Sequence, residues 1–381
     1  MKRNPLGAFD IDRFLREVWQ KNALVLRGCA PQLAGALGRA DLVDLACRED
    51  VDSRLIAGSG RHWTMRHGPF RRRDFAALPQ RNWTLLVNGV ETLVPAARAL
   101  QRDFGFIPYA RQDDVMVSYA APGGGVGPHF DSYDVFLLQG AGMRRWQIGR
   151  QRDLALIDGA PIKVLRRFRP QRELVMKSGD LLYLPPDYAH HGTAVGECLT
   201  WSIGMRAPHQ REVAARFLDY LQDHLTGDDV YRDSKPKRPS HPAAISTEMR
   251  RGLRKMIAAV RWRDADVDRC LGEMLSEPRR HAVFKQPHAV SAAAFERACR
   301  ARGLQLDLKS RMLFDRRTVY INGESVTVGT ADARIIRQLA DTRALAADAQ
   351  PGRAAMALLY GWYRSGYLEL GAAARRRAAA K

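Results

Sequence analysis

The sequence predicts an α+β protein built around one large β unit, and two patterns support this prediction. Between residues 114 and 206, short β-rich runs are separated by glycine and proline, which is typical of a barrel or a sandwich. After residue 206 the strand pattern stops and helical periodicity replaces it. The chain has 381 residues, a length that accommodates two or three domains. The expected strands cover residues 114–120, 134–140, 143–149, 174–176, 180–185 and 198–206.

The first 110 residues alternate helix-like and strand-like pieces. Apolar residues recur at helical spacing from Asp10 to Gln20, and Asp10 is placed to cap the start of that helix. The run 23–28 has the composition of a short buried strand. We therefore expect one helix and one strand to precede the main β unit.

The segment after the β unit predicts a homodimer. Residues 212–225 form an amphipathic helix whose apolar stripe includes Val213, Phe217 and Leu221. One barrel would not fully cover this stripe, so we expect a second copy to pack there; the alternative is that the helix packs back onto its own barrel. An exposed, proline-containing linker is expected over 232–246, followed by helices over 248–262 and 266–277.

The C-terminal residues predict a small winged-helix unit. The expected elements are a helix ending at Gly303, a hairpin over 312–328 that turns at Asn322 and Gly323, helices over 331–342 and 354–366, and a strand over 367–370. This outline alone says little about function. Because the last helix carries few cations, we expect the unit to contact protein or support a dimer rather than to read a nucleic-acid sequence.

Composition excludes several classes of protein. Hydrophobic residues make up 46% and charged residues 27%, and no apolar run is long enough to cross a bilayer. The five cysteines have no paired spacing and the N-terminus has no apolar signal region, so we expect a reduced, cytoplasmic protein without a membrane partner. The net charge of +20 fits a contact with nucleic acid or another anionic surface or, equally, a compositional bias toward arginine.

A candidate metal site comes from two separate motifs. His129 and Asp131 form an H-x-D at an expected strand start, where alternate residues project to the same face. About sixty residues later, His190 and His191 follow a Pro-Pro turn. Two histidines and one carboxylate form the facial triad of non-haem Fe(II) oxygenases. The alternative is a set of surface polar residues on a barrel rim, but the glycine-rich approach and the second histidine motif favour metal ligation.

Only one of the two adjacent histidines can face the metal, because neighbouring strand residues point to opposite sides. The spacing from the Pro-Pro turn selects His190 and leaves His191 on the other face. The strand between the two motifs supplies a cation for an anionic cosubstrate. On that strand Arg144 and Trp146 share one face and Arg145 lies on the other, so we expect Arg144 to be the buried cation.

Four stretches carry a family resemblance. They are SYAAPGGGVGPHFDSYDVFLLQGAGMRRW (118–146), LYLPPDYAHHG (182–192), WSIGMRAP (201–208) and FLREVWQKNALVLRG (14–28). Together they resemble the Jumonji-C ribosomal oxygenases, specifically the bacterial branch that hydroxylates an arginine of 50S ribosomal protein L16. In that family an acidic residue often follows the ligand histidine, whereas this chain has His191.

The resemblance implies a double-stranded β-helix (jelly-roll, cupin-like) core, Fe(II), 2-oxoglutarate and ribosomal protein L16 as the substrate. Carried over by position, the iron ligands are His129, Asp131 and His190, the 2-oxoglutarate cation is Arg144, and Ser202 adds a hydroxyl contact to the cosubstrate. The implied domains are a catalytic domain over 1–206, a helical dimerisation segment over 207–285 and a winged helix over 286–381.

A basic enzyme needs local acid to attract a basic ribosomal protein; the alternative is that its basic surface meets ribosomal RNA on an assembly intermediate. Asp113, Asp114 and Asp134 lie close in sequence to the metal motif and are candidates for contacting a substrate guanidinium, although capping of strand ends explains them equally well. Two rival functions stay open: the same chemistry on a histidine or another protein side chain, and a non-enzymatic nucleic-acid-binding protein with a degenerate barrel.

Overall fold

The computed structural model describes residues 4–30, 35–60, 62–225, 227, 229–233, 238 and 240–371. The chain divides into two compact units. The first comprises Met1–Ala207, Pro278–Arg311 and Gly329–Lys381, and the second comprises Pro208–Glu277 and Met312–Val328. The domain boundaries expected from the sequence stay predictions. Part of the expected linker and the last ten residues of the expected winged helix lie outside the described residues.

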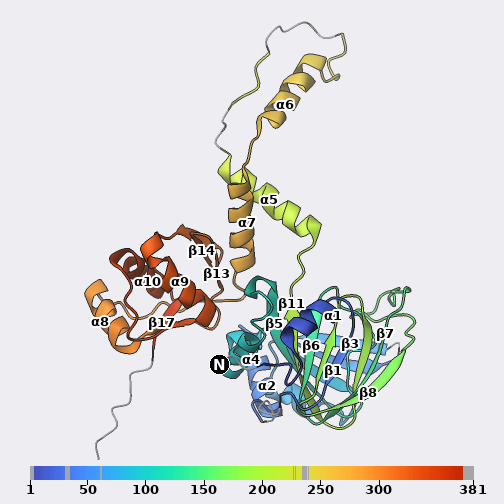
Figure 1. The fold of residues 1–381 in the computed structure, drawn as a ribbon. Coiled ribbons are helices and arrows are strands. Elements are labelled where there is room, and N and C mark those ends of the chain that lie inside the picture. Colours follow the sequence, from blue (N-terminus) through green and yellow to red (C-terminus); the bar gives the residue numbers. More distant parts are fainter. Residues whose placement is uncertain are drawn as a thin grey trace, which may run out of the picture. The chain divides into compact units, whose positions relative to one another are not determined.

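Two antiparallel sheets form the centre of the first unit (Figure 1). Their strands are β1 (Leu24–Leu26), β2 (Ser53–Ser59), β3 (His62–His67), β4 (Trp83–Val87), β5 (Gln112–Ala120), β6 (Asp134–Ala141), β7 (Met143–Gly149), β8 (Arg172–Lys177), β9 (Leu181–Leu184), β10 (Ala189–Ala194) and β11 (Cys198–Met205). The large sheet has the order β1-β9-β6-β11-β5-β4-β2-β3, and the small sheet has the order β10-β7-β8. This arrangement confirms the expected jelly-roll core.

The six strands expected from the sequence are present as β5, β6, β7, β8, β9 and β11, with ends that differ by up to two residues. β10 is the strand on which His190 and His191 were expected, although its bounds were not predicted, and β2, β3 and β4 extend the large sheet into the N-terminal part of the chain. The N-terminal part therefore belongs to the same β structure as residues 112–205.

Apolar residues cover both faces of the large sheet. The core between the two sheets consists of Val135, Leu137, Trp146, Ile148, Leu174, Met176, Leu182 and Leu184. The opposite face of the large sheet packs against N-terminal helices and turns, namely α1 (Ile11–Glu17), α2 (Arg39–Ala46), α3 (Arg72–Ala76), η2 (Val90–Thr92), α4 (Pro95–Asp103) and η3 (Tyr109–Arg111). Alternating strand residues thus serve two separate cores.

Helix α1 shows how the sequence sets this packing. The Asp10 side chain accepts a hydrogen bond from the backbone N–H of Arg13, as the capping prediction requires. The helix ends earlier than expected, at Glu17. Phe14 is fully buried, and its ring packs edge-on against Tyr183 at a centroid distance of 5.0 Å. The helix therefore anchors the N-terminus on the outer face of the large sheet.

The C-terminal part of the first unit contains α8 (Ala292–Arg302), α9 (Thr330–Thr342) and α10 (Arg353–Arg364), with a small sheet of β16 (Ala344–Leu345), β12 (Leu304–Leu306) and β17 (Leu368–Leu370). These helices gather around β17 (Figure 1). Gly303 ends α8 with a φ of +71°, and a Cβ there would lie 2.3 Å from the carbonyl oxygen of Leu345. The predicted helix stop at Gly303 is confirmed.

The second unit contains α5 (Gln210–His224), α6 (Thr247–Ala259), α7 (Asp264–Ser276) and a sheet of β13 (Met312–Asp315), β14 (Thr318–Ile321) and β15 (Glu324–Thr327). The turn between β14 and β15 falls at Asn322 and Gly323, as predicted. Helix α7 packs on this sheet: the Tyr320 ring of β14 lies so close to Gly272 of α7 that it occupies the space a side chain at Gly272 would need. Among the described residues, no helix combines the length and the apolarity that crossing a membrane requires.

The apolar stripe of α5 is half covered within its own unit. Val213, Phe217 and Leu221 are half-buried, and the Phe217 ring meets the Trp262 ring edge-on at 5.8 Å. Helix α6, in contrast, has no buried residue. Helix α6 therefore exposes more apolar surface than α5, the helix on which the sequence analysis placed the dimer contact.

Candidate functional site

The candidate metal site lies where the chain before β6 meets β10. The backbone N–H of His129 donates to the carbonyl of His190 at 2.9 Å, and the N–H of His190 donates to the carbonyl of His129 at 2.8 Å. This single antiparallel bridge sets the two imidazoles side by side, with ring centroids 4.1 Å apart. The expectation that His129 starts a strand is wrong: it lies in an extended loop, and β6 begins only at Asp134.

Asp131 completes a cluster with the two histidines. One possible ligand atom from each of His129, Asp131 and His190 lies within 4.8 Å of the others, and His190 Nε2 is 3.7 Å from Asp131 Oδ2. Two imidazoles and a carboxylate grouped in this way match the facial triad that leaves further coordination positions open. The structure thus brings together the three residues that the sequence selects.

Hydrogen bonds orient both imidazoles for metal binding. His129 Nδ1 lies 2.9 Å from the carbonyl oxygen of Gly127, and His190 Nδ1 lies 2.9 Å from that of Tyr188. A carbonyl can only accept, so each Nδ1 carries the proton and each Nε2 keeps its lone pair. Burial, with the neighbouring His129 as the next cause, lowers the pKa of His190 to about 4. His190 is therefore neutral near pH 7, which is the form that binds a metal.

The register of β10 separates His190 from His191. His190 is opposite Ile148 and Gly192 is opposite Trp146, and both partners belong to the core between the sheets. His191 is opposite Gln147, so its side chain lies on the other face, where Nε2 is 3.4 Å from Thr193 Oγ1. This geometry agrees with the choice of His190 over His191.

Arg144 is a buried cation with unused donors. It lies on β7 with 4% of its surface exposed, and its Nε and Nη2 atoms are buried without a hydrogen-bond partner. Its guanidinium carbon is 5.7 Å from the centre of the Trp146 ring. Arg145 faces the other way and pairs with Glu173 on the surface. An unpartnered guanidinium inside a barrel fits an anionic ligand, because a carboxylate would satisfy the orphaned donors.

Ser202 also lies on the inner face of the barrel. It is opposite Leu137 of β6, a residue of the core between the sheets, and it is buried. The site therefore combines three features. A cluster of possible metal ligands includes His190 of the small sheet, Arg144 of the same sheet is a cation that could bind an anion, and Ser202 of the large sheet supplies a hydroxyl group. Its residues fit a divalent metal together with a carboxylate ligand.

The candidate role of Asp134 in substrate binding is wrong. Asp134 shares its strand face with Phe136, which packs in the outer core, and it is completely buried. Its carboxylate accepts hydrogen bonds from Tyr183 Oη at 2.6 Å and from Gln20 Nε2 at 3.0 Å. These contacts tie the turn that follows α1 to the sheet. Asp113 and Asp114, by contrast, precede the residues of β5 that line the barrel.

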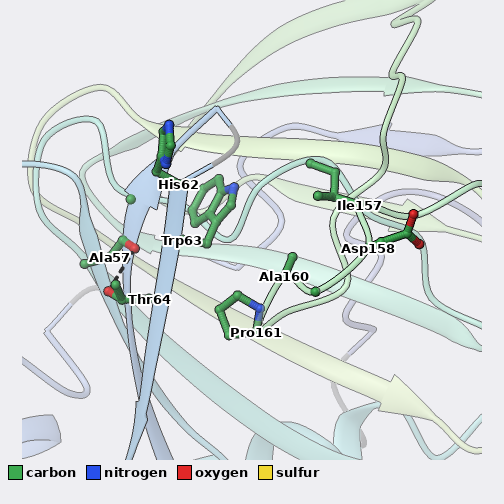
Figure 2. A pocket seen from close by; sticks show the side chains of 10 residues that line it. Ala57, His62, Trp63, Thr64, Ile157, Asp158, Ala160 and Pro161 are labelled. Carbon is green, nitrogen blue, oxygen red and sulfur yellow. Dashed lines mark hydrogen bonds between the residues drawn. The ribbon is translucent and has the colours of Figure 1, made fainter.

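A second feature near the cluster was not predicted from the sequence. The hairpin of β2 and β3 and the loop Ile157–Pro161 enclose a cavity of about 510 Å³ (Figure 2). Trp63 lines this cavity, and its ring lies against Gly127, where a Cβ would come within 3.0 Å of Cζ2. The carbonyl of Gly127 accepts the hydrogen bond that orients His129. Trp63 therefore supports this candidate ligand indirectly, by packing against Gly127. A lone tryptophan in a hairpin carries no motif that would have revealed this.

Comparisons with known proteins agree with this geometry. A model of the JmjC domain matches residues 99–213, and a model of the ROXA-like winged helix matches residues 259–369. The chain is 34% identical over 277 residues to the ribosomal protein uL16 3-hydroxylase of Escherichia coli, covering 72% of this chain and 73% of that protein. It is 44% identical over 201 residues to a probable ribosomal oxygenase of Haemophilus influenzae, covering 51% of this chain and 49% of that protein.

Solved structures extend the likeness to the whole chain. The X-ray structure of E. coli YcfD has a TM-score of 0.82 and 31% identity, covering 95% of this chain and 98% of that one. The structure of YcfD, a ribosomal oxygenase, in complex with cobalt and 2-oxoglutarate has a TM-score of 0.80 and 30% identity, covering 96% and 99%. The jelly-roll core, the winged helix and these relatives together show that the chain belongs to the JmjC ribosomal oxygenases.

Proposed function

We propose that this protein is an Fe(II)- and 2-oxoglutarate-dependent hydroxylase that acts on an arginine of ribosomal protein uL16. The observation that carries the proposal is the coexistence of the His129, Asp131 and His190 cluster with the orphaned guanidinium of Arg144 inside one barrel. A relative named as a uL16 3-hydroxylase and a YcfD structure with cobalt and 2-oxoglutarate support it.

Each residue has a defined task in this proposal. His129, Asp131 and His190 hold the iron, and Arg144 binds the far carboxylate of 2-oxoglutarate with its two free N–H groups. Ser202 donates a further hydrogen bond to the cosubstrate from the large sheet. When bound, iron and 2-oxoglutarate would allow dioxygen to react: one oxygen atom would enter a substrate C–H bond and the other would enter succinate, as 2-oxoglutarate loses carbon dioxide. The apolar core between the sheets excludes water from that reaction.

An arginine substrate is supported by the acidic residues at the start of β5. Asp113 is exposed, and Asp114 shares the inner face of the sheet with Met116 and Ser202. Carboxylates at this position attract a guanidinium locally, although the net charge of +20 repels a basic protein at long range. Asp134 takes no part, because its carboxylate is already hydrogen-bonded in the outer core.

The direct test combines two measurements. Purified protein with Fe(II), 2-oxoglutarate and uL16 is expected to form succinate and to add one oxygen atom to an arginine of uL16, located by mass spectrometry. Oxygen on a histidine of another ribosomal protein, with uL16 unmodified, would instead favour the rival substrate class. No succinate with any ribosomal protein, together with salt-sensitive RNA binding, would favour the non-enzymatic rival.

We also propose that the protein is a homodimer formed through the second unit. Helix α6 exposes an apolar stripe at helical spacing, made of Met249, Leu253, Met256 and Ile257. Leu218 of α5 is two-thirds exposed as well. A sedimentation measurement at micromolar concentration is expected to give twice the monomer mass, and a change of Leu253 and Ile257 to glutamate is expected to give a monomer. A monomeric wild-type protein would contradict the proposal.

A ribosomal-protein substrate supports a cytoplasmic location, which agrees with the expectation from the cysteine spacing. A contact with ribosomal RNA or with an assembly intermediate stays a prediction. The protein-contact role expected for the winged helix also stays a prediction.

A further inference from the structure

Arg279 reaches one buried carboxylate, Glu91, and one half-buried carboxylate, Asp114, of the catalytic region. It follows Pro278, where the chain re-enters the first unit after α7. Its Nη2 atom lies 3.0 Å from Asp114 Oδ2, and its Nε atom lies 3.4 Å from Glu91 Oε1. Glu91 is 2% exposed, so this is not a loose surface ion pair. An arginine from the C-terminal half of the chain therefore neutralises an acidic pocket next to β5.

The pocket has space for that guanidinium. Gly89 has a φ of +66°, and a Cβ at this position would come within 3.1 Å of Arg279 Cδ and Nε. The backbone N–H of Gly89 donates to Asp114 Oδ2 at 3.3 Å, and Glu91 Oε2 accepts from the N–H of Val115 at 2.8 Å. The loop before η2 is thus shaped to hold both carboxylates against Arg279.

Asp114 connects this ion pair to the open end of the barrel. The Oδ2 atom of Asp114 is paired with Arg279. Its Oδ1 atom faces Gly204 and would lie 3.4 Å from a Cβ atom built on that glycine. The ring of Tyr133 lies 3.5 Å from the same position. Gly204 is two residues beyond Ser202 on one strand face, and Tyr133 is two residues beyond Asp131. Asp114 therefore lies between Arg279 and the residues that surround the candidate centre.

We propose that Arg279 is a positioning residue that orients Asp114 and favours its carboxylate form for contact with the substrate guanidinium. This inference rests on the proposed function, because it assigns a purpose to the acidic wall of the arginine site. Arg279 itself does not touch the substrate; it acts through Asp114. A residue of the segment 259–369, which the winged-helix model matches, thereby contributes to substrate recognition.

The charges around Asp114 explain why a cation is needed. Asp114 faces Arg279, Glu91 of η2, Asp113 on its own strand and Tyr133 across Gly204. Burial raises the pKa of Asp114 to about 7, and Glu91 and Asp113 add to the rise, while Arg279 opposes it. Burial lowers the pKa of Arg279, but the carboxylates of Asp114 and Glu91 outweigh it and raise that pKa. Without Arg279, Asp114 would be mainly neutral at pH 7.

The test uses Arg279→Met and Arg279→Lys in the full-length protein with Fe(II), 2-oxoglutarate and a uL16 peptide. Loss of a charge-assisted contact predicts that Arg279→Met raises the KM for the peptide roughly tenfold to a hundredfold at pH 7. The KM for 2-oxoglutarate and the peptide-independent turnover of 2-oxoglutarate are expected to stay unchanged. Arg279→Lys is expected to restore most of the peptide affinity. Arg145→Met, which removes a surface arginine on the outer face, is the matched control.

The pH profile separates this role from a merely structural one. The KM of the wild-type protein for the peptide is expected to fall as pH rises through the pKa of Asp114, and Arg279→Met is expected to move that midpoint upward. Asp114→Asn is expected to raise the KM and to abolish the midpoint, and adding Arg279→Met to it is expected to change nothing further. This second variant keeps the proposal testable if Arg279→Met folds poorly.

Two results would overturn the inference. An unchanged KM and pH midpoint in Arg279→Met would show that Asp114 does not depend on Arg279. A lower KM would show that Arg279 competes with the substrate for Asp114. Failure of the wild-type protein to modify uL16 would instead refute the proposed function, so the two failures are distinguishable.

Discussion

Replacing Arg144 by methionine is expected to change stability and cosubstrate binding in opposite directions. In the protein without ligands, Arg144 Nε and Nη2 are buried without hydrogen-bond partners, and each unsatisfied donor costs about 1–3 kcal/mol. Methionine has a similar length and no polar atoms, so Arg144→Met removes this cost. For the two donors together we expect the ligand-free variant to be more stable than the wild type by about 2–6 kcal/mol, measured as a higher urea midpoint.

The same substitution removes the partner of a carboxylate. Two hydrogen bonds to a charged group contribute about 3–4 kcal/mol together, so the KM for 2-oxoglutarate is expected to rise about a hundredfold to a thousandfold. A thermal shift assay gives an independent measurement, because 2-oxoglutarate with a divalent metal should stabilise the wild type and not the variant. Arg145→Met should change neither quantity. A less stable Arg144→Met protein with an unchanged KM for 2-oxoglutarate would refute this reasoning.

Three further predictions follow from the site and its surroundings. His190→Ala is expected to weaken cobalt binding by more than about a hundredfold, whereas His191→Ala is expected to retain it, because only His190 faces the metal site. Titration calorimetry measures the cobalt affinity of both variants, and the reverse result would contradict the register of β10. Tyr183→Phe is expected to destabilise the fold by about 1.5–3 kcal/mol, because the buried Asp134 loses a hydrogen bond of 2.6 Å; an unchanged urea midpoint would contradict this. The pKa of Asp114 is raised to about 7, so the folded state binds its proton more tightly than the unfolded state. The contribution of Asp114 to the free energy of unfolding therefore falls as pH rises from the ordinary carboxyl range toward 7. Urea midpoints measured across this pH range should show a weaker pH dependence in Asp114→Asn than in the wild type.

Local patterns predicted the β unit and the candidate ligands well. Strands such as β5 and β11 are recognisable because their apolar residues are dense and are bounded by glycine and proline. The assignment of Arg144 to the inner face and Arg145 to the outer face needed only the two-residue period of a strand. The same rule shows that only one of His190 and His191 can face the metal, and the spacing from the Pro-Pro turn selected His190.

Features that depend on pairing partners were harder to predict. β10 has the sequence AHHGTA, which lacks the apolar alternation of a typical strand, and it is stabilised by pairing with β7. Asp134 was grouped with Asp113 and Asp114 by proximity in sequence, but the register of β6 turns it into the outer core. The contact of Arg279 with Asp114 joins residues far apart in the chain, and no periodicity or motif connects them.

The most direct test of the central claim is mass spectrometry of uL16 after incubation with the purified protein, Fe(II) and 2-oxoglutarate, with succinate measured in the same samples. We predict that one arginine of uL16 gains one oxygen atom in step with succinate formation, and that His190→Ala abolishes both products. Unmodified uL16 in the presence of active, iron-loaded wild-type protein, or oxygen added only to a different side chain, would contradict the account.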